Sequence, residues 1–215
     1  MYQVCVKICG LTSRDQAFAC VDSGVSWLGF NCYPPSPRYI SPEKIREICA
    51  QLPEEVNTVG VFVNEPLHQL EQIMNETGLV LAQLHGDETP EYTSALKISW
   101  MKAFRASPEF EISQIKQYGQ QKFLLDAWHP NLYGGSGKTI DDWSLAAQAA
   151  RQGTMFLAGG LRNANIAEAI QQVKPFGVDV CSGIESSPGV KDINKLKELL
   201  NTVHQTQLQL SANEQ

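Results

Sequence analysis

Two side chains that could exchange protons with a substrate, a thiol and a carboxylate, stand at the ends of apolar runs. Cys9 closes the run Val4–Cys9, and Asp126 follows the run Lys122–Leu125. A cysteine in a partly exposed, electropositive site can titrate near neutral pH and act as a base. A carboxylate directly after apolar residues must be paired, hydrated or functional. The plainer alternatives are a buried structural cysteine and a helix-capping aspartate, although the next predicted helix begins far downstream of Asp126.

Two glycine-containing turns could bind a phosphate group. Leu157–Leu161 reads LAGGL and Cys181–Glu185 reads CSGIE, and each follows an apolar run. Backbone N–H groups at such turns and at helix N-termini are good phosphate ligands. Ordinary chain reversals are the alternative, but two such turns on consecutive runs favour a phosphate site.

A further anion-binding candidate is Arg38, in the proline-rich segment PPSPRYISP. The prolines stiffen this segment, and a guanidinium held in place can make two parallel hydrogen bonds to a carboxylate. A hydrated surface arginine is the alternative.

The segment GGSGKT at 134–139 resembles a nucleotide-binding P-loop, but Leu132 stands where that motif needs a further glycine. We therefore expect a flexible loop over the site and no nucleoside triphosphate.

These side chains need regular elements to position them, and the chain alternates short apolar runs with helix-like stretches. Eight strands are predicted at Val4–Cys9, Trp27–Phe30, Thr58–Val63, Leu79–Leu84, Ile98–Phe104, Lys122–Leu125, Thr154–Ala158 and Gly177–Val180. Helices are predicted after Ser13, at Pro42–Gln51, Pro66–Glu76, from Pro90, and at Pro108–Tyr118, Asp142–Arg151, Asn163–Val173 and Asp192–Val203.

Eight strand–helix units predict an α/β fold, a parallel (β/α)8 or TIM barrel, with an open doubly wound sheet as the alternative. No linker divides the chain, so we expect one barrel domain over 1–204 and a polar, frayed tail over 205–215. The carboxyl ends of barrel strands form the site. The side chains placed there are Lys7, Cys9, Asn31, Asn64, His85, Arg105, Asp126, Gly159, Gly160 and Asp179 to Ser182.

Composition restricts the class of protein. The 215 residues are 43% hydrophobic and 19% charged, with a net charge of −6, which excludes a disordered chain. An acidic chain without a Lys/Arg cluster does not predict nucleic-acid binding, and no apolar run approaches the ~20 residues of a membrane span. The first residues, MYQVCVKICG, lack the apolar core of a signal peptide, and we expect the six cysteines to be reduced thiols in the cytoplasm.

Nine segments occur in an order that resembles one enzyme family. They are KICGLT, SPRYISP, VGVFVN, QLHGDE, KAFR, LLDAW, YGGSGKT, LAGGL and VDVCSGIESSPGVKD. Together, from about Val4 to Val203, they closely resemble phosphoribosylanthranilate isomerase of tryptophan biosynthesis, a (β/α)8-barrel family.

The resemblance implies an Amadori rearrangement of N-(5-phosphoribosyl)anthranilate, with Cys9 as general base and Asp126 as general acid. It implies a phosphoribosyl substrate and no metal or organic cofactor, because the iminium intermediate is itself the electron sink. The remaining implied site residues are Arg38 on the anthranilate carboxylate, His85 and Asp179 as further substrate-binding groups, and Gly159, Gly160, Ser182 and Gly183 at the phosphate.

Some residues depart from the family pattern, and some alternatives stay open. Asn31 and Cys32 replace apolar residues, TIDDW at 139–143 is one residue longer than usual, and Cys181 replaces a common serine. The rival functions are a histidine-pathway ribotide isomerase, which uses two aspartates, and a non-catalytic sugar-phosphate-binding barrel. The protein is expected to be a monomer or a homodimer.

Overall fold

The computed structural model describes residues 2–119, 122–127 and 143–212. Its centre is a ring of eight parallel strands that closes because β1 pairs with both β2 and β8. The strands are β1 (Cys5–Ile8), β2 (Trp27–Asn31), β3 (Asn57–Phe62), β4 (Leu81–Leu84), β5 (Trp100–Ala106), β6 (Lys122–Ala127), β7 (Thr154–Leu157) and β8 (Gly177–Val180). The predicted (β/α)8 barrel is confirmed, and the open-sheet alternative is excluded.

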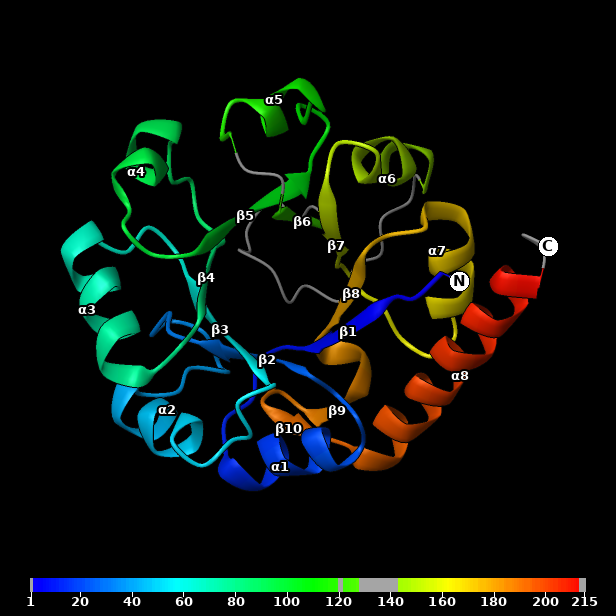
Figure 1. The fold of residues 1–215 in the computed structure, drawn as a ribbon, viewed down its shortest axis with the longest axis horizontal. Helices are drawn as coiled ribbons and strands as arrows, with labels where there is room; N and C mark the ends of the chain where they lie inside the picture. The colour runs from blue at the N-terminus through cyan, green and yellow to red at the C-terminus, as the bar shows by residue number, and fades with distance from the viewer. Residues whose placement is uncertain (1, 120–121, 128–142, 213–215) are drawn as a thin grey trace.

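Helices surround this ring, as Figure 1 shows. They are α1 (Arg14–Asp22), α2 (Pro42–Cys49), α3 (Leu67–Thr77), α4 (Pro90–Ala95), α5 (Ser113–Lys116), α6 (Trp143–Ala150), α7 (Ile166–Val173) and α8 (Ile193–Ala212). Between β8 and α8 the chain adds the 3-10 turn η1 (Ser182–Ile184) and an antiparallel pair, β9 (Glu185–Ser187) with β10 (Val190–Lys191).

Local residue chemistry accounts for several helix ends. The Ser13 hydroxyl accepts a hydrogen bond from the Gln16 N–H at 3.4 Å, which caps α1. Pro42 and Pro90 open α2 and α4, where a missing N–H leaves no hydrogen bond unmade. Gly78 ends α3 in the left-handed region with φ 74°, a conformation that costs glycine little.

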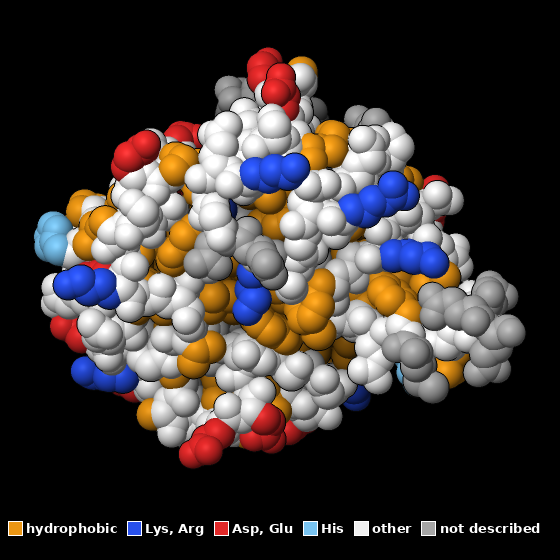
Figure 2. Space-filling view, turned by 45° about the horizontal axis from the view of Figure 1, so that its top comes forward, with side chains coloured by type: hydrophobic (Ala, Val, Ile, Leu, Met, Phe, Trp, Pro, Cys, Tyr) orange, Lys and Arg blue, Asp and Glu red, His pale blue; other side chains and the backbone are white. Residues whose placement is uncertain are grey.

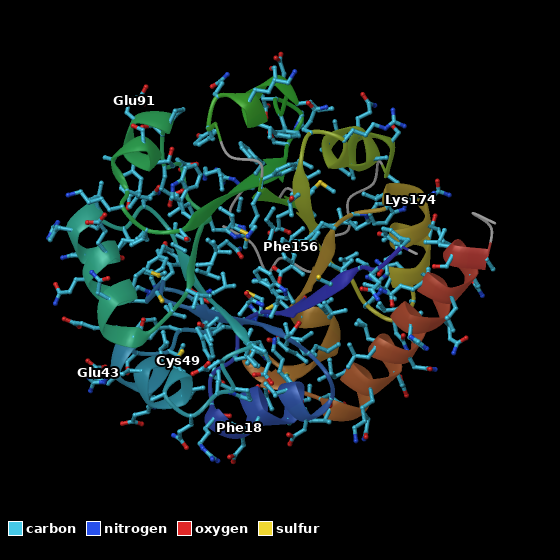
Figure 3. The ribbon with its side chains drawn as sticks, viewed as in Figure 1. Phe18, Glu43, Cys49, Glu91, Phe156 and Lys174 are labelled. Carbon is cyan, nitrogen blue, oxygen red and sulfur yellow. The ribbon has the colours of Figure 1, made fainter. Side chains whose placement is uncertain are left out.

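Strand alternation divides the core into two layers. Inside the barrel, Val59, Leu81, Met101, Ala103, Leu124, Phe156 and Ala158 form one buried cluster. The other cluster fills the space between strands and helices. Figure 3 labels Phe156 near the centre of the ring, and Glu43 and Glu91 at its periphery. In β1, Ile8 belongs to the outer layer, so Lys7 and Cys9 point inward.

Two predicted segments differ from the structure. The prediction of a helix over Pro108–Tyr118 is wrong except for Ser113–Lys116. The flanking residues instead use short turns that pack the Phe110 and Tyr118 rings against Phe104, at 5.8 and 5.4 Å between ring centroids.

The expectation that the tail frays from residue 205 is wrong for 205–212, because α8 continues to Ala212. Thr206 is buried in this segment, and the Gln207 side chain donates to the Val4 carbonyl at 3.2 Å. Residues 205–212 therefore stay helical, although most of them are polar, because one face of the helix is buried.

The GGSGKT segment at 134–139, expected to be a loop over the barrel, lies outside the described residues. In the described part of the chain, no helix combines the length and the apolarity needed to cross a membrane. On the face seen in Figure 2, Lys and Arg side chains stand singly among apolar and uncharged ones.

Candidate active site

A cavity of about 680 Å³, part of it open to solvent, lies at the carboxyl ends of the strands. Eight of the nine residues predicted for the site line it: Cys9, Arg38, His85, Asp126, Gly159, Gly160, Asp179 and Ser182. The structure thus brings together residues from six of the eight strand ends, or from the segments that follow them.

Cys9 enters this cavity from the end of β1. Its backbone N–H donates to the Val180 carbonyl at 2.9 Å, which extends the β1–β8 pairing by one residue. The side chain is only 8% exposed. Burial raises the pKa of the Cys9 thiol above its usual range, whereas the charge of Lys7 acts in the opposite direction. The thiol is therefore less exposed than the sequence suggested, and a nearby cation has to support its thiolate form.

Asp126 lies in the same cavity, on β6, and is buried. Its Oδ1 accepts a hydrogen bond from the Ala127 N–H at 2.9 Å, and its Oδ2 lies 3.2 Å from His85 Nε2. The other ring nitrogen of His85, Nδ1, lies 2.8 Å from Gln83 Nε2. The chain Gln83–His85–Asp126 crosses from β4 to β6 and fixes the direction of the carboxyl group.

Arg38 is held by a carboxylate of this same chain. Its Nε and Nη2 donate to the two oxygens of Glu185 at 2.9 and 2.8 Å. Lys191 Nζ lies 2.9 Å from Glu185 Oε1, the oxygen that also accepts from Arg38 Nε. Burial alone would raise the pKa of Glu185, but hydrogen bonds from Arg38 and Lys191 outweigh it and lower the pKa to about 2. Within the described residues the Arg38 Nη1 group makes no hydrogen bond, so it is available to a ligand carboxylate.

Asp179 pairs with a lysine that is fully buried. Lys7 Nζ lies 2.8 Å from Asp179 Oδ1, and the two residues are register partners on β1 and β8. Asp179 lines the cavity and Lys7 does not. The pair thus lies in the inner layer of the barrel, directly beneath Cys9.

The two glycine-containing turns have backbone conformations or backbone contacts that favour glycine. Gly159 and Gly160 have φ of 96° and 59°. A Cβ on Gly183 would lie 1.9 Å from the Leu161 carbonyl oxygen, so only glycine fits there. Gly183 is the one predicted site residue that does not line the cavity. In the described part of the chain the N–H groups of Gly159 and Gly160 donate no hydrogen bond, which leaves them available to an anion.

Sequence reasoning placed two polar residues at the site that the structure uses elsewhere. Asn64, with φ 53°, accepts a hydrogen bond from the Asp87 N–H at 2.7 Å. Arg105 forms an ion pair with the same Asp87. Both stabilise the loop after β4 and lie outside the residues that line the cavity.

The sequence reasoning also missed three supporting residues around the site, Gln83, Glu185 and Lys191. It placed Lys7 at the strand ends but gave it no role. Only Lys7 and Gln83 carried a signal, because each is a polar residue at an inward position of an apolar strand. Across the described residues, no three His, Cys, Asp or Glu side chains gather as a metal site would require.

A closed eight-stranded parallel barrel, with a cavity at the carboxyl ends of its strands that is lined by a thiol and a carboxyl group, defines the (β/α)8-barrel class. The model of the N-(5′-phosphoribosyl)anthranilate isomerase family matches residues 6–202. The chain belongs to this family.

Individual relatives agree with this assignment. The N-(5′-phosphoribosyl)anthranilate isomerase of Pelobacter propionicus is 43% identical over 201 residues, which cover 94% of this chain and 96% of the relative. The crystal structure of phosphoribosyl anthranilate isomerase from Thermotoga maritima is 37% identical, with a TM-score of 0.87, over 94% of this chain and 100% of that one.

A further crystal structure of phosphoribosyl anthranilate isomerase holds the reduced form of 1-(o-carboxyphenylamino)-1-deoxyribulose 5-phosphate. It is 36% identical to this chain, with a TM-score of 0.84, over 94% of this chain and 100% of that one.

Proposed function

We propose that Cys9 is the general base and Asp126 the general acid of the reaction that this family catalyses. As a member of the family, the chain is an isomerase of tryptophan biosynthesis that converts N-(5′-phosphoribosyl)anthranilate into 1-(o-carboxyphenylamino)-1-deoxyribulose 5-phosphate. The observation that supports these roles is the entry of both side chains into one cavity, from β1 and from β6.

The first step needs an acid. Asp126, in its protonated form, gives its proton to the furanose ring oxygen while the lone pair of the anthranilate nitrogen forms a double bond to C1 of the sugar. The bond between C1 and the ring oxygen breaks, and an open-chain iminium results. The contact between Asp126 and His85 supports this role because it holds the carboxyl oxygen in one direction.

The second step needs a base. The Cys9 thiolate removes the proton from C2, and the electron pair of that C–H bond moves toward the iminium nitrogen to give an enolamine. The enolamine then tautomerises to the ketone. Because the iminium accepts the electrons, neither a metal nor an organic cofactor is required in this scheme.

We assign binding roles to the remaining predicted residues. The N–H groups of Gly159 and Gly160, together with Ser182 and the close-packed turn at Gly183, would hold the phosphate. Arg38, through its Nη1, would hold the anthranilate carboxylate. His85 and Asp179 line the same cavity and stay predicted substrate-binding groups. In the structure His85 contacts Asp126 and Gln83, and Asp179 contacts Lys7.

The test is turnover of N-(5′-phosphoribosyl)anthranilate, made in place from anthranilate and phosphoribosyl pyrophosphate and followed by loss of its fluorescence. We expect Cys9→Ser and Asp126→Asn each to lower kcat by about 10²- to 10⁴-fold, the usual contribution of a general acid or base, with smaller changes in KM.

Cys181→Ser is the matched control, because Cys181 is a thiol in the same cavity that has no proposed role. It should keep the wild-type kcat. A Cys9→Ser variant as active as Cys181→Ser would remove Cys9 from the mechanism, and an equally active Asp126→Asn would do so for Asp126.

We further propose that the protein works in the cytoplasm as a monomer or a homodimer. Six free cysteines fit a reducing compartment. A similar crystal structure, 37% identical with a TM-score of 0.84, concerns monomers generated from the dimeric isomerase of Thermotoga maritima. Sedimentation equilibrium tests the assembly against the chain mass of 23.8 kDa.

A further inference from the structure

Lys7 is a charged side chain with no contact to solvent. It occupies an inward position of β1, and its exposed fraction is 0%. Removing an ammonium group from water is costly unless other charges and hydrogen bonds compensate. The contacts that stabilise this charge therefore indicate what the lysine does.

Asp179 provides the first compensation. Its Oδ1 lies 2.8 Å from Lys7 Nζ, on the neighbouring strand β8. Burial alone would lower the pKa of Lys7, but Asp179 and Cys9 together raise it above its usual range. Lys7 is thus a fixed positive charge at neutral pH.

Cys9 is the second partner of this charge. Lys7 and Cys9 are two residues apart on β1, so both side chains point into the barrel. They converge on Gly29 of β2: an ideal Cβ on Gly29 would lie 2.9 Å from Cys9 Sγ and 3.0 Å from Lys7 Nζ. Glycine at this position leaves room for the sulfur and the ammonium group. Lys7 lowers the pKa of Cys9 both through its charge and as a hydrogen-bond donor, against the larger effect of burial.

We propose that Lys7, held by Asp179, is a positioning residue that stabilises the thiolate of Cys9 from beneath the cavity. Lys7 does not line the cavity, so it acts on the substrate only through Cys9. This inference rests on the proposed role of Cys9 as the base.

Other charged and titratable groups also surround Cys9, and Lys7 is distinguished from them by geometry. Lys191 also favours the Cys9 thiolate, but its ammonium group contacts Glu185 at 2.9 Å and the Cys181 sulfur at 3.7 Å. The Lys7 ammonium group instead meets the Cys9 sulfur at Gly29. Asp179 disfavours the thiolate. The remaining groups at the cavity are Arg38, which is paired with Glu185, and Cys181, His85 and Asp126.

The experiment measures the ionisation of Cys9 directly, without turnover. Substrate-free protein is alkylated with iodoacetamide at a series of pH values, and modification of the Cys9 peptide is quantified by mass spectrometry. Because only the thiolate reacts, the rate follows its population. The pH at which this rate reaches half of its maximum is the midpoint. We expect Lys7→Gln, which keeps a hydrogen-bond donor for Asp179 but loses the charge, to raise the midpoint by at least about one pH unit. That shift lowers the rate about tenfold at any pH below the midpoint.

Two variants make this measurement specific. Lys7→Arg keeps the charge and should keep the midpoint near the wild-type value. Lys102→Gln removes another buried lysine that is paired with a carboxylate, Glu88 at 2.9 Å, and should leave the Cys9 midpoint unchanged. If Lys7→Gln does not fold, the double variant Lys7→Met/Asp179→Asn removes both buried charges together and is compared with Asp179→Asn alone. The midpoint of the double variant should lie above that of Asp179→Asn by at least about one pH unit.

A Lys7→Gln midpoint equal to that of wild type and of Lys102→Gln, in folded protein, would overturn the proposal. In turnover assays, Lys7→Gln should lower kcat while KM stays near its wild-type value. If the wild type itself fails to convert N-(5′-phosphoribosyl)anthranilate, the proposed function fails, and the alkylation series still decides the role of Lys7.

Discussion

Cys9 and Asp126 must begin the proposed reaction in opposite protonation states, although they share one buried cavity. Such splitting of two titratable groups by their surroundings is how acid and base roles arise. Here the surroundings differ clearly: Cys9 stands above the Lys7 ammonium group, and Asp126 faces the His85 ring. In the proposed mechanism, the neighbouring side chains therefore decide which group acts as the base and which as the acid.

The raised pKa of Cys9 predicts a pH dependence. Burial raises this pKa above the usual range, so the thiolate is the minor form at neutral pH and its population rises about tenfold per pH unit below the pKa. We expect kcat/KM, which reports the free enzyme, to rise with pH between 6 and 8. Stopped assays across this range check it, and a flat profile would contradict the assignment of Cys9 as the base.

The lowered pKa of Glu185, about 2, predicts a stability effect. The pKa of a glutamate in an unfolded chain is about 4.3. The stabilisation from the Glu185 carboxylate is therefore full above that pH and is lost as the pH falls toward 2. The wild-type Tm should therefore fall more steeply between pH 5 and 3 than that of Glu185→Gln, which has no charge to lose. Parallel slopes in differential scanning calorimetry would exclude Glu185 as the source.

Arg38 has two tasks, because it binds Glu185 through Nε and Nη2 and is proposed to bind substrate through Nη1. Lysine cannot do both, since it has no planar fork. We expect Arg38→Lys to raise KM about tenfold, the equivalent of ~1.4 kcal/mol or one charge-assisted hydrogen bond, with a smaller change in kcat. Steady-state kinetics measure KM and kcat separately. An unchanged KM would argue against the proposed contact between Arg38 Nη1 and the substrate carboxylate.

At the scale of elements, the strands followed from the sequence better than the helices did. Each predicted strand overlaps an observed one, since a buried parallel strand is predominantly apolar. The helix over Pro108–Tyr118 failed because aromatic packing of Phe110 and Tyr118 on Phe104 decides that segment, and a one-dimensional pattern does not contain this packing.

The end of α8 gives a prediction at the same scale. Removal of 205–215 would expose the surface that Thr206 covers and the Val4 carbonyl that Gln207 contacts. A loss of about 1–2 kcal/mol corresponds to a fall in Tm of roughly 2–8 °C for a chain of this size. The matched control removes only 213–215 and should keep the wild-type Tm. Equal melting of both truncated chains would show that the last turns of α8 contribute nothing.

For the whole molecule, the fold predicted where the site lies but not how its parts are paired. Eight of nine predicted residues line the cavity because the carboxyl ends of the barrel strands surround it. The ion pair between Arg38 and Glu185 joins residues that are 147 positions apart, and no local pattern marks it. The spacing of residues along the chain indicates which strand end each one occupies. Its ion-pair or hydrogen-bond partner is decided only when the strands close into a ring and bring distant segments together.

The contact between β1 and β8 has a consequence for the order in which the protein is made. Translation delivers Lys7, and Cys9 two residues later, whereas Asp179 follows 172 residues after Lys7. Until then, Lys7 has no counter-charge with which to enter the barrel interior. The Cys9 thiol, the proposed base, therefore acquires its surroundings only when β8 docks against β1. Recovery of activity during refolding should then coincide with amide protection of β1 and β8, and ribosome-bound chains that end before β8 should be inactive.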